Sequence, residues 1–202
     1  MFSHCMLAAA DPRFVIQVHG GAWAIPESLR QPHIDGVRRA HGAALDALKS
    51  GVRPLEAVLA ALKVMEREKI EGAMVNIISV NAHGGTSFLT PYSASKGALV
   101  TLTKNFAHSV ANRRIKVNGL NIGWVDTPGE HVTLQRFHGA PDNWLAAAEA
   151  SRPWGRLMKP DEVARAVAFL VSDESGLMTG SIIDFDQVVQ GPNEQIGPAP
   201  RS

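Results

Sequence analysis

The sequence has little of several features, and each scarcity excludes a class of protein. Cys5 is the single cysteine among 202 residues, so no disulfide can form within the chain. One cysteine suits the reducing cytoplasm, which is where we expect the protein. No apolar run reaches the length that crosses a membrane, and the opening MFSHCMLAAADPR lacks the basic stretch of a signal peptide. We therefore expect no membrane partner.

An excess of charge is also missing. The chain has 20 basic and 19 acidic residues, a net charge of +1. Because no basic face or acidic tail stands out, nucleic acid is not expected as a partner. The hydrophobic content of 45% suffices for a core of ordinary size.

The histidines lack the spacing of a zinc site, so no metal is expected. We interpret His83, His108, His131 and His138 as surface or loop residues, with a substrate contact left open for His131 and His138. Asp184 and Asp186 need no catalytic role. Packing is the favoured role for Trp124, Trp144 and Trp154, and lining of an apolar pocket is the alternative.

Hydrophobic periodicity predicts strands that alternate with helices. Apolar β-prone runs predict strands over 14–19, 73–80, 115–125 and 180–187. Apolar stripes at helical spacing predict helices over 33–50, from Pro54 to about 68, through Tyr92 to about 111, over 143–149, and from Pro160. This alternation predicts an α/β fold with a parallel sheet.

Tyr92 and Lys96 form the first candidate for chemistry. They stand four residues apart in PYSASKGAL, which places them on one helix face. A cation beside a phenol favours the phenolate, so the tyrosine could act as a general acid and base. Ser79 lies thirteen residues before Tyr92 at the end of a predicted strand, where its hydroxyl could hold a substrate oxygen. By itself, a Tyr-x-x-x-Lys pair is more often an ordinary surface helix pair.

Residues 72–191 resemble the C-terminal half of a short-chain dehydrogenase/reductase. The resemblance rests on Ser79, YSASKGAL, NIGWVDTP and GLMTGS, in the order that is typical of this family. It implies a partial Rossmann-like parallel sheet with flanking helices, and NAD or NADP as cofactor. The small residues of SASKGAL allow either close packing within one chain or a homo-oligomer.

The resemblance also implies roles for particular residues. Ser79, Tyr92 and Lys96 would be catalytic, with Tyr92 as the acid and base, Ser79 orienting the substrate and Lys96 holding the nicotinamide ribose. Tyr92, Lys96, Ile122, Gly123 and Thr127 would bind the cofactor, with Gly123 and Thr127 at its nicotinamide end. The substrate would be a small alcohol or carbonyl compound.

The sequence departs from this family in several places. Ile122 replaces the usual proline before Gly123, and Ile78 replaces a common serine. No Thr-Gly-x-x-x-Gly-x-Gly loop is present to receive a pyrophosphate, and HGGAWA at 19–24 is the nearest candidate. The chain has no asparagine before Asn76, so the family's catalytic asparagine is also missing.

Residues 13–67 resemble a different family, the plant-type asparaginases and isoaspartyl peptidases. The resemblance rests on RFVIQVHGGAWAIPESLR and on the helical AVLAALKVMERE that follows. It implies a strand and two helices of different origin, without the threonine nucleophile of that family. We therefore predict a flexible N-terminus over 1–12, an asparaginase-like fragment over 13–71, a dehydrogenase-like half over 72–191, and a disordered tail over 192–202.

Three functions follow in order of preference. The first is an NAD(P)-dependent oxidoreductase, impaired by the missing glycine-rich loop. The second is a non-catalytic or chimeric interaction module, and the third an amidohydrolase. We also expect the strand at 14–19 to join the sheet beside the strand at 73–80, which would otherwise expose an unpaired edge.

Overall fold

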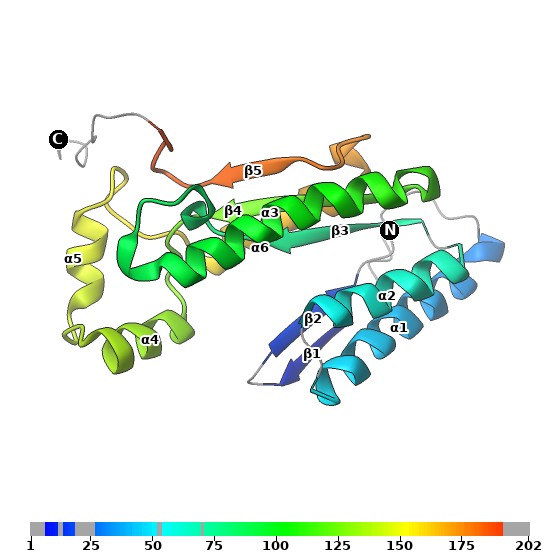
Figure 1. The fold of residues 1–202 in the computed structure, drawn as a ribbon, viewed down its shortest axis with the longest axis horizontal. Helices are drawn as coiled ribbons and strands as arrows, with labels where there is room; N and C mark the ends of the chain where they lie inside the picture. Colours follow the sequence, from blue (N-terminus) through cyan, green and yellow to red (C-terminus); the bar gives the residue numbers. More distant parts are fainter. Residues whose placement is uncertain (1–6, 12–13, 19–26, 52–53, 70, 192–202) are drawn as a thin grey trace. The chain divides into compact units, whose positions relative to one another are not determined.

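The computed structural model describes residues 7–11, 14–18, 27–51, 54–69 and 71–191. As the sequence predicted, the fold is α/β and Rossmann-like, with a three-stranded parallel sheet flanked by helices (Figure 1). The chain divides into two compact units. The first comprises Met1–Val75, Lys104–Asn118 and Phe169–Gly180, and the second comprises Asn76–Thr103, Gly119–Ala168 and Ser181–Ser202. The predicted disordered tail over 192–202 lies outside the described residues.

The first unit contains a two-stranded antiparallel sheet. Strand β1 (Leu7–Asp11) pairs with β2 (Phe14–Val18), so Leu7 lies opposite Val18. The expectation that the strand at 14–19 joins the parallel sheet is therefore wrong. The adjacent segment 7–11, which was expected to be flexible, supplies the partner strand instead. Closing a loop of a few residues costs less conformational entropy than closing the long loop to a distant strand. The candidate loop at 19–24 lies outside the described residues.

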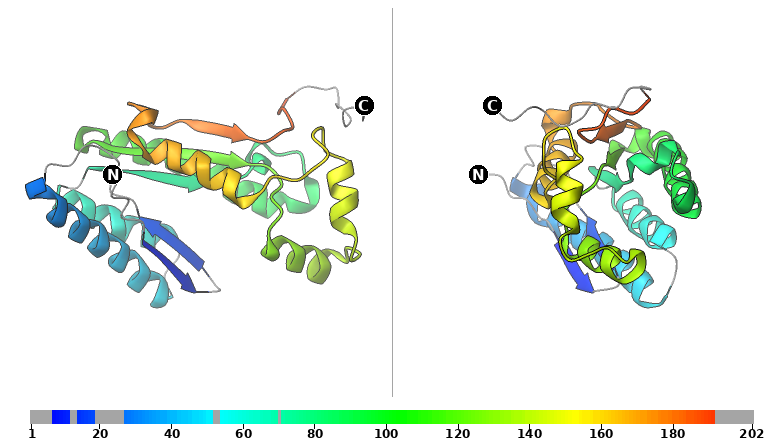
Figure 2. Two further views of the ribbon diagram at one scale, coloured as in Figure 1. Left: turned by 180° about the vertical axis from the view of Figure 1, so that it is seen from behind. Right: turned by 90° about the vertical axis from the view of Figure 1, so that its left-hand side faces the viewer.

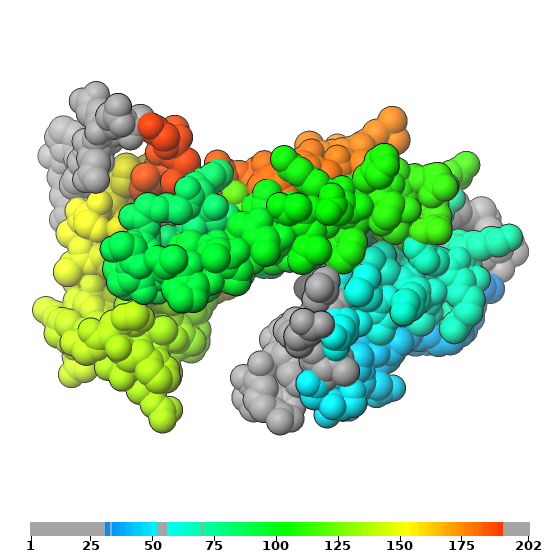
Figure 3. Space-filling model, viewed as in Figure 1, coloured from blue at the N-terminus to red at the C-terminus, as the bar shows by residue number. Residues whose placement is uncertain are grey.

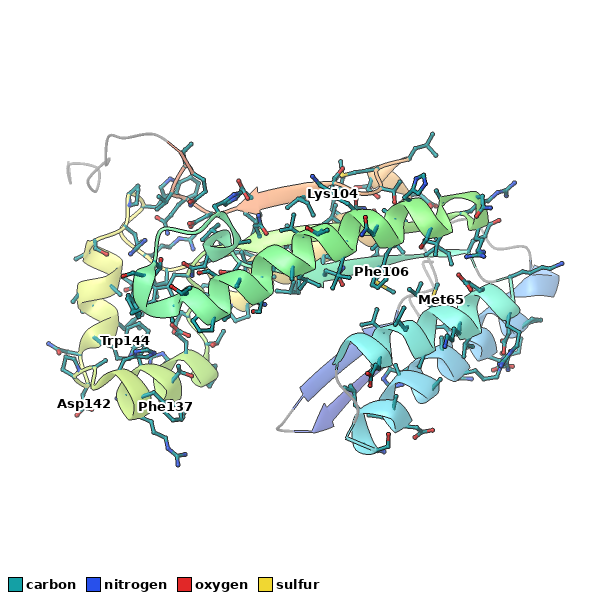
Figure 4. The ribbon with its side chains drawn as sticks, in the orientation of Figure 1. Met65, Lys104, Phe106, Phe137, Asp142 and Trp144 are labelled. Atoms are coloured by element: carbon teal, nitrogen blue, oxygen red, sulfur yellow. The ribbon has the colours of Figure 1, made fainter. Side chains whose placement is uncertain are left out.

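Helices α1 (Glu27–Lys49) and α2 (Pro54–Arg67) pack side by side in the first unit (Figure 1). Proline starts α2, as predicted, whereas α1 begins six residues before the predicted His33 and includes Pro32. Alanines at the contact allow close approach, and the core extends to Met65 of α2 and Phe106 (Figure 4). Arg39 of α1 donates to Glu68, just after α2, at 2.8 and 2.9 Å.

The parallel sheet has the order β3-β4-β5, with β3 (Gly72–Ile77), β4 (Ile115–Ile122) and β5 (Ile182–Phe185). Gly119 of β4 pairs with Ile182 of β5. The central strand is buried almost throughout, although it carries Asn118 and Asn121 between its apolar residues. β3 is shorter than predicted because Ser79 already caps the 3-10 turn η1 (Val80–His83).

Four more helices follow β3: α3 (Thr90–Val110), α4 (Pro128–His138), α5 (Trp144–Ala150) and α6 (Pro160–Val171). In the second unit, α3 and α6 cover opposite faces of the sheet (Figures 1 and 2). Short 3-10 turns lie at Ser87–Leu89, Ala111–Arg113 and Asp173–Ser175. Within the described ranges, no helix is long and apolar enough to cross a membrane.

The sequence analysis missed α4. Its start carries ordinary signals: the Thr127 hydroxyl accepts from the Glu130 backbone N–H at 3.0 Å, and Pro128 occupies the first turn. No residue of α4 is buried, so the helix has no strong apolar stripe to reveal it.

Candidate active site

Helix α3 brings Tyr92 and Lys96 together on one face. The Lys96 Nζ atom lies 5.5 Å from the centre of the Tyr92 ring and donates to the Ile77 carbonyl oxygen at 3.2 Å. Burial lowers the pKa of the Lys96 ammonium. Tyr92 is 41% exposed, which leaves its side chain open to a ligand, and Figure 3 shows the outward surfaces of α3 and α4 uncovered.

Ser79 lies at the same end of β3. Ile77 is the last residue of that strand and receives the Lys96 hydrogen bond, and Ser79 follows two residues later. Ser79 is 6% exposed, and its hydroxyl accepts from the Asn81 backbone N–H at 3.2 Å. The hydroxyl can still donate a hydrogen bond to a substrate oxygen, because the cap uses it only as an acceptor.

The predicted nicotinamide loop, Ile122 to Thr127, follows the neighbouring strand. Ile122 ends β4 opposite Phe185, and the Gly123 N–H donates to the Phe185 carbonyl at 3.0 Å. Thr127 has an additional structural role as the N-cap of α4. The carboxyl ends of parallel strands meet at one edge of a sheet, so this loop and Ser79 belong to the same edge.

A polar cluster that the sequence analysis did not identify lies at this edge. The Asp184 Oδ1 atom of β5 accepts from Asn121 Nδ2 at 2.8 Å and lies 2.8 Å from His83 Nε2. Asn121 is fully buried, while His83 and Asp184 are partly exposed. Burial raises the pKa of Asp184, but the hydrogen bonds from His83 and Asn121 outweigh it, and the net direction is down. His83 and Asp184 are 101 residues apart, so no local pattern could have linked them.

A second polar cluster fixes the start of α4. The Asp126 carboxylate accepts from Lys159 Nζ at 2.7 Å, and its other oxygen lies 2.8 Å from His131 Nε2. Hydrogen bonds from Lys159 and then from His131 hold the pKa of Asp126 below its usual value. The His131 side chain is 39% exposed on α4, so it is a surface residue as expected, and it is also held in this cluster.

Trp124 and Trp144 pack, as the favoured interpretation had it. Trp124 stacks on Trp144 with ring centres 5.8 Å apart, and the Arg152 guanidinium lies 5.2 Å from the centre of the Trp124 ring. Trp144 is buried in a small core between α4 and α5, with Asp142 and Phe137 nearby (Figure 4). In contrast, Trp154 is 73% exposed and borders a pocket of about 180 Å³.

The same pocket is lined by a charged pair. Arg156 donates to both carboxylate oxygens of Glu162 at 2.7 Å, and the Lys159 N–H adds a bond at 2.8 Å. The Arg156 guanidinium, and after it the Lys159 N–H, lowers the pKa of Glu162 to about 2. The pair ties the segment before α6 to the first turn of that helix.

Tyr92, Lys96 and the loop after β4 could hold the nicotinamide half of a nicotinamide dinucleotide. An ammonium group has three N–H donors, and Lys96 uses one of them on Ile77 in the described part of the chain. Its other donors can hold ribose hydroxyls beside Tyr92. The pyrophosphate half has no matching glycine-rich loop anywhere in the sequence. Within the described ranges, no group of three or more metal-binding side chains is assembled.

Comparison with known proteins points to one family. A family model described as enoyl-(acyl carrier protein) reductase matches residues 14–187, which includes most of the segment that resembles an asparaginase. A 3-oxoacyl-[acyl-carrier-protein] reductase of Thermotoga maritima is 36% identical over 115 residues, covering 57% of this chain and 44% of that protein. A cis-4-hydroxycyclohexanecarboxylate dehydrogenase of Sinomonas cyclohexanicum is also 36% identical over 115 residues, covering 57% and 43%. The chain thus spans less than half the length of these curated relatives.

Solved structures agree with this assignment. Aldohexose dehydrogenase of Thermoplasma acidophilum superposes with a TM-score of 0.60 at 27% identity, covering 70% of this chain and 58% of that one. A gluconate 5-dehydrogenase of Burkholderia cenocepacia, in complex with NADP and tartrate, gives 0.54 at 29% identity, covering 66% and 51%. The strand-end serine, the Tyr92–Lys96 pair and the loop after β4 lie within residues 14–187, which the family model matches. The chain therefore belongs to the short-chain dehydrogenase/reductase family.

Proposed function

We propose that this chain is an NAD(P)-dependent oxidoreductase that acts on a small alcohol or carbonyl compound. The observation that carries the proposal is the position of Lys96, half-buried beside the Tyr92 ring and hydrogen-bonded to the end of β3. A cation held there favours the ionised form of a neighbouring phenol. The relatives named above, a 3-oxoacyl reductase and dehydrogenases of hydroxylated compounds, support this class of substrate.

The residues would divide the chemistry between them. When bound, the cofactor supplies the hydride acceptor or donor at the substrate carbon. In alcohol oxidation, the Tyr92 phenolate takes the hydroxyl proton as the C–H bond breaks, so the products are a carbonyl, the reduced cofactor and one proton. In reduction, the Tyr92 hydroxyl returns that proton. The Ser79 hydroxyl donates to the substrate oxygen and holds it near Tyr92.

Cofactor binding would rest on the nicotinamide end. Lys96 would hold the ribose hydroxyls, and Ile122, Gly123 and Thr127 would border the nicotinamide. We propose that affinity is low, because the sequence offers no glycine-rich loop whose backbone N–H groups could receive the pyrophosphate.

A second candidate function follows from the missing glycine-rich loop. A chain that keeps the fold without holding the cofactor would act as an interaction or dimerisation module, natural or chimeric. An amidohydrolase is the least favoured function, because the threonine nucleophile that the asparaginase resemblance requires is missing. We expect a cytoplasmic protein in each case.

Calorimetric titration with NAD(H) and NADP(H) tests the first function. We expect saturable binding that weakens about tenfold or more in Lys96→Ala, which corresponds to the loss of about 1.4 kcal/mol. Lys104→Ala is the matched control, because it removes an exposed lysine from the same helix, roughly 12 Å further along. Absence of binding at millimolar cofactor would overturn the oxidoreductase and leave the interaction module.

A turnover assay then tests the role of Tyr92. With a panel of alcohols and ketones, Tyr92→Phe should lower kcat by about 100-fold or more, because the proton transfer is lost, and should weaken cofactor binding much less than Lys96→Ala does. Equal turnover by Tyr92→Phe and the unmodified chain would contradict the assignment.

A further inference from the structure

The end of β5 carries two carboxylates, Asp184 and Asp186, that the proposed chemistry does not use. They are two residues apart: Asp184 lies in β5, and Asp186 follows Phe185, the last residue of that strand. Each contacts a different segment at the edge of the sheet where Ser79 and Gly123 lie. Both contacts fall within the second unit.

Asp184 ties down the turn that holds Ser79. Its Oδ1 atom lies 2.8 Å from His83 Nε2. His83 is the last residue of η1, and Ser79 is the N-cap of that turn. The same oxygen accepts from the buried Asn121 amide at 2.8 Å, which fixes the carboxylate against β4. The η1 turn is therefore attached at both ends, by the Ser79 cap and by His83.

Asp186 lies directly against Gly123. A Cβ atom added to Gly123 would lie 2.1 Å from Asp186 Oδ1 and 2.3 Å from its Cγ, distances that no real Cβ atom shows. The Gly123 N–H is held by Phe185, the residue between the two aspartates, at 3.0 Å. The Gln187 backbone N–H donates to the Asp186 Oδ1 atom at 2.8 Å, which helps to hold the carboxylate in place. Burial raises the pKa of Asp186, in keeping with a half-buried carboxyl.

We propose that Asp184 and Asp186 are positioning residues of the site: Asp184 acts through His83 on Ser79, and Asp186 acts through Gly123 on the loop leading to Thr127. The inference rests on the proposed oxidoreductase function. It assigns the two carboxylates separate effects, since Ser79 would contact the substrate and Gly123 the cofactor.

Backbone hydrogen exchange tests the proposal without any cofactor. Asp184→Ala should speed exchange at residues 79–84 and leave 123–127 unchanged, whereas Asp186→Ala should do the reverse. Asp184→Asn should largely restore protection at 79–84, because its amide oxygen can still accept from Asn121 and His83. Asp142→Ala is the control, since it removes an exposed carboxylate near the start of α5 (Figure 4). Uniform acceleration across both segments, or none, would overturn the proposal.

Kinetics and cofactor binding add a second test that separates the two claims. Gly123→Ala should weaken cofactor binding about tenfold or more, and adding Asp186→Ala should recover most of that loss, because it empties the space the new methyl group needs. Asp184→Ala should lower kcat about tenfold with cofactor affinity unchanged. If the unmodified chain binds no cofactor, the proposed function fails while the exchange result still decides the positioning roles. Binding without rescue in the double variant would overturn the role of Asp186.

Discussion

Gly119→Ala is the substitution whose cost can be worked out most directly from the structure. Gly119 lies in the middle of β4, where it pairs with Ile182 and donates its N–H to Ser181 at 2.8 Å. An added Cβ would lie 2.6 Å from Ile78 Cδ1 and 2.8 Å from Ile182 Cδ1. Carbon atoms prefer a separation near 3.5–4.0 Å, so both methyl groups must move by about 1 Å. Ile78 is 1% exposed, so its side chain cannot relieve the contact by turning into solvent without leaving the core.

The expected cost follows from two opposing terms. Overpacking a core by one methyl group costs about 1–3 kcal/mol. Replacing glycine by alanine also restricts the unfolded chain, which offsets roughly 0.4–1 kcal/mol. We therefore expect Gly119→Ala to lower the free energy of unfolding by about 1–2 kcal/mol, measured by urea denaturation followed by far-UV circular dichroism.

Two further variants make this prediction specific. In α1, a methyl group added at Gly42 meets no atom within 4 Å among the described residues beyond the backbone of its own helix, so Gly42→Ala should instead stabilise the chain by about 0.5–1 kcal/mol. Ile78→Val removes the Cδ1 atom in closest contact, so Gly119→Ala should cost less in that background than in the unmodified chain. A Gly119→Ala protein as stable as the unmodified one would refute the packing argument.

Two other predictions concern caps and charge. Thr127→Val removes the acceptor for the Glu130 N–H and should cost about 1 kcal/mol of unfolding free energy, whereas Thr127→Ser should cost much less; equal losses would show that the hydroxyl does not cap α4. Glu162→Gln should lower stability near neutral pH, because the pKa of Glu162 is depressed to about 2 in the fold by Arg156 and then by the Lys159 N–H. A depressed carboxyl pKa stabilises the folded state above the unfolded pKa of 4.5 and loses that effect as pH falls towards 2. The difference between Glu162→Gln and the unmodified chain, measured by urea midpoints, should therefore shrink over that range, and a constant difference would contradict the ion-pair argument.

The sequence by itself determined the elements whose signals are local. Helix spacing alone places Lys96 on the face of Tyr92, and Pro54 alone indicates where α2 begins. The β-prone residues at 73–77 likewise predict β3. Thr127, Pro128 and Glu130 also signalled the start of α4, although the weak apolar pattern of that helix hid it.

Only the tertiary structure decided which distant segments meet. β2 pairs with β1 rather than with the parallel sheet because β1 is the nearest partner strand along the chain. The hydrophobic pattern of β2 alone does not indicate which strand it will pair with. The contacts of Asp184 with His83 and of Asp186 with Gly123 join segments 101 and 63 residues apart. Periodicity and capping report on neighbours within about one turn of the chain, whereas these contacts exist because the ends of parallel strands converge at one edge of a sheet.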